Sequence, residues 1–330
     1  MKAVPQVRSS AYLPFVAFLE SAGVPVERDP EGALISAVAH RDKEALVPVH
    51  LAHAFLERGA RLLGHEDFGV LVGTGMRIEE LGAFGRNLCR SLTLHDALNK
   101  FPSQYSLYSS AERIWWVREN DVAYFLHSYT FETGHGSCYA RHCALLLMRD
   151  LIRLSAGPLW QPELLLTTEP GDTSLLRDAF GDPVIRRSKV SGIAFPASLL
   201  SIPLDQDRRK RLERIDPDAF DGTIPSDDFV GSLCQVIATL MPEGKCSLDQ
   251  AAPTLGMHPR TLQRRLSKVG QDYSAILSQV RFEKALRLMA DPTLRICDIA
   301  LELGFQDASN FSRSFRKWTG TRPTAFRRSN

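Results

Sequence analysis

The sequence predicts a mainly α-helical protein with a small β-containing part in its N-terminal domain and an all-α C-terminal domain. Three observations support this fold class. Apolar residues recur at spacings of three and four through most of the chain, one short stretch alternates instead, and one helix–glycine–helix pattern occurs twice near the C-terminus. The 330 residues, 44% hydrophobic and 24% charged, are typical of a globular protein with two or three domains.

Residues 10–110 are expected to be mostly helical. Their apolar residues form three stripes, each with helical spacing, and Gly, Ser and Thr residues separate the segments. The stripes are Tyr12, Phe15, Val16 and Leu19; then Leu51, Phe55, Leu62 and Leu63; and then Leu81, Phe84, Leu88 and Leu92. We interpret them as core-facing sides of helices.

Residues 111–131 change to a period of two. Aromatic and β-branched residues flank the polar segment 118–121, a pattern that predicts a hairpin of two strands. Both predicted faces are bulky, so the hairpin is either plain core or lines a ligand cleft. The residues that would line such an effector pocket are Trp115, Trp116, Tyr124 and His127.

Residues 135–143 hold a cluster of metal-ligand residue types, His135, Cys138, His142 and Cys143. The next segment is apolar and a fourth ligand at suitable spacing is missing, so buried structural side chains are expected and no metal site is predicted. The chain has no GxSxG, HExxH, P-loop or GxGxxG motif, and neither catalytic residues nor a cofactor are expected.

The composition also bears on the cellular compartment. No apolar run approaches the length of a membrane span, the first ten residues do not resemble a signal peptide, and none of the six Cys residues forms a CxxC pair. We expect a cytoplasmic protein with reduced thiols.

The C-terminal pattern consists of two helices separated by a glycine, of which the second is apolar on one side only. In residues 296–317 the turn is at Gly304, and Phe311 and Phe315 form the apolar side of the second helix. Residues 247–268 repeat this plan with Gly256, and Ser247 and Gln250 form a capping box at its start. Cationic and polar residues occupy the other side of each second helix, as in a helix-turn-helix that enters the DNA major groove.

These residues resemble the AraC/XylS family of transcription regulators, whose DNA-binding domain joins two helix-turn-helix units by a long helix. The residues that carry the resemblance are Arg281, Ala285, Leu288, Ile296, Ile299, Ala300, Gly304, Phe305, Ser309, Phe311, Arg313, Phe315, Gly320, Pro323, Phe326 and Arg327. The long helix is expected from about Tyr273 to Met289, a length of roughly 25 Å at 1.5 Å per residue. This length suits two recognition helices near one turn of DNA.

The resemblance implies which side chains read bases. They are Arg260, Gln263 and Arg264 in the first unit, and Ala308, Ser309, Ser312 and Arg313 in the second. Arg and Gln can each form two hydrogen bonds with a base edge, whereas Ala and Ser discriminate weakly, so the first unit is predicted to carry more specificity. Arg265, Arg316 and Lys317 are predicted to contact phosphates.

Three positions depart from the usual pattern of the two units. His258 stands at a capping position and is expected to be a poor N-cap, with Pro259 compensating in part. Pro253 is expected to bend or shorten the helix before it, and Arg295 replaces a capping Ser.

The segment from Ala179 to Leu200 is similar to the N-terminal domain of one AraC-family branch, usually called an arabinose-binding-type domain. The similarity extends over roughly residues 10–205. We therefore expect an effector-sensing or dimerisation domain at 1–205, a linker or short helix at 206–228, and an AraC-type DNA-binding domain at 229–330, with units at about 247–268 and 296–317.

The charge distribution agrees with this division. Residues 226–330 contain 15 Lys and Arg and 10 Asp and Glu, a net charge of +5, whereas the other 225 residues contain 25 and 28, a net charge of −3. The expected partners are double-stranded DNA, a small-molecule effector, RNA polymerase if the protein is an activator, and a second copy in a homodimer.

Two other functions fit the sequence. One is a regulator without a small-molecule effector, controlled by its abundance or by a protein partner. The other is a DNA-repair and regulator fusion that uses an activated Cys, which requires an exposed thiolate at Cys138 or Cys143.

Overall fold

The computed structural model describes residues 2–28, 30–131, 134, 136–168, 174–213 and 223–329. The chain divides into two compact units. One contains residues 5–45 and 52–225, and the other contains residues 226–330 together with the short segments 1–4 and 46–51.

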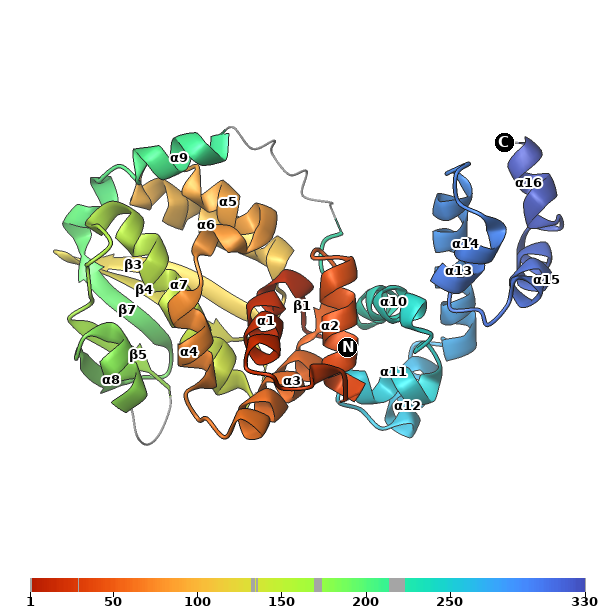
Figure 1. Ribbon diagram of the computed structural model, residues 1–330, viewed down its shortest axis with the longest axis horizontal. Helices are drawn as coiled ribbons and strands as arrows, with labels where there is room; N and C mark the ends of the chain where they lie inside the picture. The colour runs from red at the N-terminus through yellow and green to blue at the C-terminus, as the bar shows by residue number, and fades with distance from the viewer. Residues whose placement is uncertain are drawn as a thin grey trace. The chain divides into compact units, whose positions relative to one another are not determined.

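The N-terminal unit is built of helices around one five-stranded sheet (Figure 1). Its helices before the sheet are α1 (Leu13–Ser21), α2 (Pro30–Arg41), α3 (Val49–Leu63, whose first residues belong to segment 46–51), α4 (Phe68–Gly75), α5 (Gly82–Cys89) and α6 (Leu94–Tyr108). The later helices are α7 (Ser137–Ala156), α8 (Ser174–Phe180) and α9 (Gln206–Glu213). The short strand β1 (Gln6–Arg8) belongs to this unit, whereas β2 (Leu46–Pro48) lies in segment 46–51 of the other unit. The predicted helical stretch 10–110 is confirmed.

The sheet has the strand order β3-β4-β7-β5-β6. Its strands are β3 (Glu112–Glu119), β4 (Val122–Tyr129), β5 (Leu164–Thr167), β6 (Val184–Arg187) and β7 (Ser191–Pro196). The predicted hairpin is confirmed as β3 and β4, whose last pair is Glu119 with Val122. Asn120 makes the turn at a φ of 56°, in the left-handed region that Asn tolerates better than most residues.

One face of the hairpin packs against α6. Phe125 lies 5.1 Å from Phe101 between ring centroids, and the Trp116 indole N–H donates to Asn99 Oδ1 at 3.1 Å. The opposite face, with Trp115 and Tyr124, is partly exposed. The strands β5 to β7 lie in the sequence region that showed similarity to the family, where no strand was predicted.

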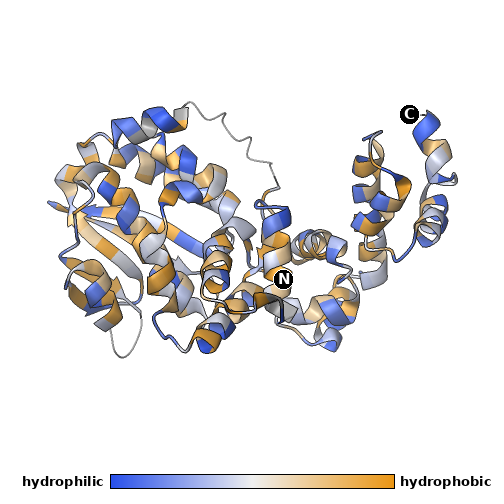
Figure 2. Cartoon of the chain, in the orientation of Figure 1, coloured by the Kyte–Doolittle hydropathy of each residue, from blue (hydrophilic) through white to orange (hydrophobic). Residues whose placement is uncertain are grey.

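The C-terminal unit contains the helices α10 to α16. They are α10 (Phe229–Leu240), α11 (Leu248–Thr254), α12 (Pro259–Ser267), α13 (Tyr273–Met289), α14 (Ile296–Glu302), α15 (Ala308–Thr319) and α16 (Pro323–Ser329). The helix α13 leads from α10–α12 to α14–α16 (Figure 1), and its ends agree with the predicted 273 and 289. Orange and blue segments succeed one another along the helices in Figure 2, as expected for helices with one buried side.

The short segments 1–4 and 46–51 are part of this C-terminal unit. The Val4 backbone N–H donates to Ser232 Oγ at 2.9 Å, and the Thr239 hydroxyl donates to the Leu46 carbonyl at 2.9 Å. Both acceptor and donor side chains belong to α10. The unit therefore contains residues far outside the predicted range 229–330. Of the predicted linker, residues 206–213 form α9, and 214–222 are outside the described residues.

Candidate nucleic-acid interface

The turn glycines position the second helix of each unit. Gly256 has a φ of 64° and Gly304 a φ of 66°, so both occupy the left-handed region predicted for them. The space around each is also restricted. A Cβ on Gly304 would stand 2.7 Å from the Met241 carbonyl oxygen, and one on Gly256 would stand 2.9 Å from the His50 ring. A larger residue at either position would therefore displace the turn.

The second helix of the first unit, α12, buries Leu262 and Leu266 and exposes Arg260, Gln263 and Arg264. Its start differs from the prediction. His258 Nδ1 accepts a hydrogen bond from the Arg260 backbone N–H at 3.3 Å, so His258 does cap the helix, with Pro259 at the first helical position. The imidazole can accept because one ring nitrogen of neutral His carries no proton.

The second helix of the second unit, α15, buries Phe311 and Phe315 completely. Their rings lie 5.5 Å apart, and Phe315 also meets Phe326 of α16 at 5.3 Å. Asp307 caps α15 by accepting from the Asn310 backbone N–H at 2.7 Å. The negative charge of this carboxylate also interacts favourably with the positive end of the helix dipole.

The predicted base-reading residues of α15 differ in their exposure. Ser309 and Arg313 are exposed, and Ala308 and Ser312 are half-buried. A chain of hydrogen bonds holds Arg313, because the Asn310 amide donates to Asp307 Oδ2 at 2.6 Å and the Arg313 guanidinium donates to Asn310 Oδ1. Asn310 was not predicted as a functional residue. Its spacing of three from both Asp307 and Arg313 is the signal in the sequence.

The predicted phosphate contacts have different environments. Arg316 and Lys317 are exposed on α15. Arg265 is half-buried, and its guanidinium lies 5.5 Å from the Phe229 ring centroid in a cation–π contact. A hollow beside α12 is lined by Arg264, Arg265, Lys268 and Lys2. Lys2 comes from the opposite end of the sequence, and nothing in its neighbours indicates this placement.

The helix α13 connects the two helix-turn-helix units and is held to the second of them by side-chain contacts. The Arg281 guanidinium donates to the carbonyl oxygens of Leu303 at 3.0 Å and Gly304 at 3.1 Å and lies 4.3 Å from the Phe305 ring centroid. The Trp318 indole N–H donates to Ser278 Oγ at 2.8 Å. Arg281 thus binds the turn of the second helix-turn-helix unit, and Trp318 links α15 to α13.

Two other expectations at helix starts agree with the structure. Ser247 and Gln250 form the predicted capping box of α11, which contains Pro253 and is only seven residues long. Arg295 makes no side-chain cap at α14 and forms an ion pair with Asp298 at 2.8 Å.

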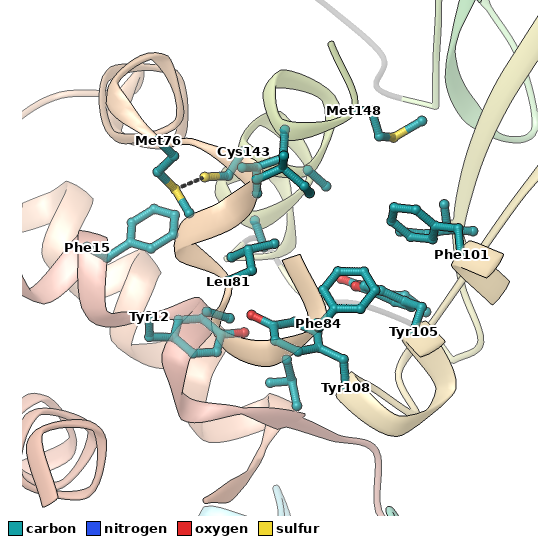
Figure 3. Close-up of a pocket in the computed structure, with 18 residues that line it drawn as sticks. Tyr12, Phe15, Met76, Leu81, Phe84, Phe101, Tyr105, Tyr108, Cys143 and Met148 are labelled. Atoms are coloured by element: carbon teal, nitrogen blue, oxygen red, sulfur yellow. Dashed lines mark hydrogen bonds between the residues drawn. The ribbon is translucent and has the colours of Figure 1, made fainter. Parts of the chain in front are cut away.

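A cavity in the N-terminal unit bears on ligand binding (Figure 3). It has a volume of about 70 Å³ and is lined by Val7, Ala11, Tyr12, Phe15, Met76, Ile78, Leu81, Phe84, Phe101, Tyr105, Tyr108, Glu112, Ile114, Ala140, Cys143, Ala144, Leu147 and Met148. The predicted pocket residues Trp115, Trp116, Tyr124 and His127 are not in this lining. Their role in binding remains a prediction. The aromatic residues at helical spacing in 101–108 were the feature of the sequence that could have indicated this cavity lining.

The described residues show no cluster of three or more His, Cys, Asp or Glu that could hold a metal ion. His135 is outside the described residues, and His142 and Cys143 are buried. Burial raises the pKa of the Cys143 thiol, which disfavours the thiolate that methyl-transfer chemistry requires. In the part of the chain that the structure describes, no helix is both long and apolar enough to cross a membrane.

Two family models match the chain. Residues 23–204 match the arabinose-binding domain found at the N-terminus of AraC transcription regulators, and residues 251–329 match a helix-turn-helix domain. The chain belongs to the AraC family of transcription regulators. Its function is sequence-specific DNA binding in transcription regulation, and its family relatives are regulators and not enzymes.

The chain is also similar to individual proteins. The ornithine utilization regulator of Pseudomonas aeruginosa is 25% identical over 270 residues, which are 81% of this chain and 80% of that protein. The regulator VirS of Mycobacterium tuberculosis is 38% identical over 105 residues, about a third of each chain. The crystal structure of the regulator CdpR from P. aeruginosa aligns over 97% of this chain and 98% of its own, with 20% identity and a TM-score of 0.43.

Proposed function

We propose that this AraC-family regulator is gated by a small-molecule effector that binds in the cavity of its N-terminal unit. The observation that carries the proposal is an apolar cavity in the unit that matches the ligand-binding family model. An effector changes DNA binding only if it binds two states of the protein with different affinities. The related regulator of P. aeruginosa is named for ornithine utilization, which is compatible with metabolite sensing by this architecture.

The base-reading surface of the proposal consists of exposed and half-buried residues on α12 and α15. Arg260, Arg264 and Arg313 suit guanine, since a guanidinium donates to O6 and N7 together, and Gln263 suits adenine. Ala308 offers only apolar contact to a thymine methyl, and Ser309 and Ser312 offer single hydroxyls. Three of the four strong readers are on α12, which supports the greater specificity assigned to the first unit.

Phosphate contacts would orient the protein on DNA without reading its sequence. Arg265, Arg316 and Lys317 take this role, and the hollow beside α12 adds Lys2 and Lys268 to it. Each phosphate that these cations neutralise releases condensed counterions, so affinity should fall as salt rises.

The quaternary arrangement belongs to the same proposal. A homodimer would bind two sites, in direct or inverted repeat, with one pair of recognition helices on each. RNA polymerase is the further partner if the protein activates transcription.

DNA recognition is tested by selecting sites from a randomised duplex pool on the full-length protein and measuring binding by fluorescence anisotropy at several salt concentrations. A selected site that spans two major-groove segments about one turn apart is expected, because the 17 residues of α13 have a length of roughly 25 Å, which suits two recognition helices near one turn of DNA. A single uninterrupted site of a few base pairs would contradict simultaneous use of both helices.

Effector gating is tested by a thermal-shift screen of the full-length protein against amines, acids, sugars and amino acids. A ligand present at a hundred times its dissociation constant stabilises its domain by about 2.7 kcal/mol, which is readily seen as a rise in melting temperature. Each hit is then added to the DNA-binding assay. Hits that leave DNA affinity and footprint unchanged would contradict gating.

A further inference from the structure

The cavity lining offers an uneven set of chemical groups to a ligand. Of its 18 residues, one carries a formal charge at neutral pH, and this residue is Glu112. The lining has no Lys, Arg or His, and most of its surface is aliphatic or aromatic. A ligand that fits this lining has an apolar body and at most one polar end.

Glu112 stands at the start of β3, with its side chain only 12% exposed. Its carboxylate accepts a hydrogen bond from the Tyr105 hydroxyl, and Oε1 lies 3.6 Å from His127 Nε2. Among the residues that the structure describes, no Lys or Arg forms an ion pair with Glu112. Burial removes water from this carboxylate, and pairing with a ligand cation would compensate for the lost hydration.

Two neighbouring tyrosines show the influence of this charge. Burial, followed by the negative charge of Glu112, raises the pKa of Tyr12 and of Tyr129. Tyr12 lines the cavity, and Figure 3 shows its hydroxyl directed toward that of Tyr108. The phenol groups of both tyrosines therefore remain neutral.

The aromatic residues add a second attraction for a cation. Phe84 is in ring contact with Phe101 at 5.2 Å, Tyr105 at 5.4 Å and Tyr108 at 5.0 Å between centroids. Ring faces attract ammonium groups, with an energy that increases when the pair is removed from water. A cluster of rings beside a buried carboxylate is the combination that binds ammonium ligands.

We propose that the cavity binds a small apolar primary amine, with the ligand ammonium paired to Glu112 and its hydrocarbon body among the aromatic rings. The proposal rests on effector gating and names the chemical class of the effector. It also excludes other classes. An α-amino acid would bury a carboxylate with no cation to pair it, and a sugar would bury many hydroxyls against hydrocarbon.

The cavity volume sets the size of the ligand. About 70 Å³ is room for several water molecules, or for a short aliphatic body. Isopentylamine is therefore the first probe and 2-phenylethylamine the second. Each is compared with the alcohol and the carboxylic acid of matched skeleton, 3-methylbutanol with 4-methylpentanoic acid, and 2-phenylethanol with 3-phenylpropanoic acid. Ornithine is included as a diamino acid.

The experiment measures dissociation constants by calorimetry on the full-length protein and on two variants. Glu112→Gln keeps the side-chain shape and removes the charge, and Glu119→Gln, at the exposed end of the same strand, is the matched control. At least one amine should bind at least tenfold more tightly than its alcohol and its acid. Glu112→Gln should abolish this preference while alcohol binding persists, and Glu119→Gln should retain it.

Several outcomes would overturn the proposal. They are tighter binding of the acids or of ornithine, no binding by either amine, or an unchanged amine preference in Glu112→Gln. Because the ligand series is also compared on the unmodified protein, a variant that fails to fold does not remove the test. An acid or sugar that binds and alters DNA affinity would refute the amine class and leave effector gating standing. An amine that binds without altering DNA affinity would refute effector gating and leave the amine class standing.

Discussion

The two helix-turn-helix units follow one plan and differ in how their second helices are held. In α12 two leucines form the buried side and His258 makes a long capping hydrogen bond. In α15 two phenylalanines join a cluster of rings, and Asp307 makes a short one. The side chains proposed as strong base readers have the opposite distribution, since three are on α12 and one is on α15. The comparison suggests that the second unit anchors the protein and the first unit selects the sequence.

The largest expected effect comes from the aromatic core of the second unit. Phe315→Ala should destabilise the DNA-binding unit by about 3–5 kcal/mol, because it removes a fully buried ring and leaves a cavity. Leu266→Ala in the first unit should cost about 2–5 kcal/mol. Denaturant unfolding of full-length variants measures both values. A smaller loss for Phe315→Ala than for Leu266→Ala would contradict the anchoring role.

The second effect concerns sequence selection. Arg264→Ala should weaken binding to the selected site by about 1–3 kcal/mol and relax one base position, since its side chain can form two hydrogen bonds with a guanine. Arg313→Ala should relax one position in the other half of the site. Repeating the site selection with each variant checks this prediction. An unchanged preference with Arg264→Ala would remove the first unit from base reading.

The third effect concerns the caps. Asp307→Ala should cost about 1 kcal/mol of stability, the usual loss for removing a capping carboxylate. His258→Ala should cost less, because its side chain accepts only a long hydrogen bond, 3.3 Å from the Arg260 backbone N–H. Equal losses on thermal unfolding would show that the two starts are equivalent. Asp307→Asn, which retains the acceptor, serves as the control.

The fourth effect is uniform across DNA sequences. Lys317→Ala in α15 and Lys2→Ala beside α12 should each weaken binding to all sites alike. Each should also make the negative slope of log affinity against log salt less steep by about 0.9. Anisotropy titrations on a selected and a scrambled duplex measure both quantities. An unchanged slope for Lys2→Ala would place this residue off the DNA. Glu119→Gln in the N-terminal unit provides an unrelated control.

The sequence predicted features whose causes are local. The turn glycines, the capping box at Ser247, the ends of α13 and the β3–β4 hairpin all depend on residues within a few positions of one another. His258 was predicted to be a poor N-cap, and the structure shows that it does cap the helix, through a long hydrogen bond of 3.3 Å from the Arg260 backbone N–H.

Features formed by distant segments could not be predicted in this way. The strands β5 to β7 acquire their partners from elsewhere in the chain, and the lining of the cavity comes from Tyr12, Phe84, Tyr105, Glu112 and Cys143. Lys2 reaches the hollow beside α12 only because residues 2–4 pack on α10. Such convergence depends on packing over more than a hundred residues, for which a single sequence carries no periodic signal.

The smallest effect concerns acid stability of the helix that joins the two units. Asp272 caps α13, and hydrogen bonds from the Ser274 hydroxyl and the Ala275 backbone N–H lower its pKa. Because the folded pKa is lower than the unfolded value of about 4, the stabilisation is present above that value and is lost as the pH falls through the folded pKa. Asp272→Asn keeps the capping acceptor but cannot titrate. Hydrogen exchange at the start of α13, corrected for the intrinsic rate, should therefore accelerate between pH 5 and pH 3 in the unmodified protein and less in the variant. The same acceleration in both proteins would mean that acid destabilises α13 through other carboxylates. The Asp272 cap would then not be the source of the acid sensitivity of the helix that joins the two helix-turn-helix units.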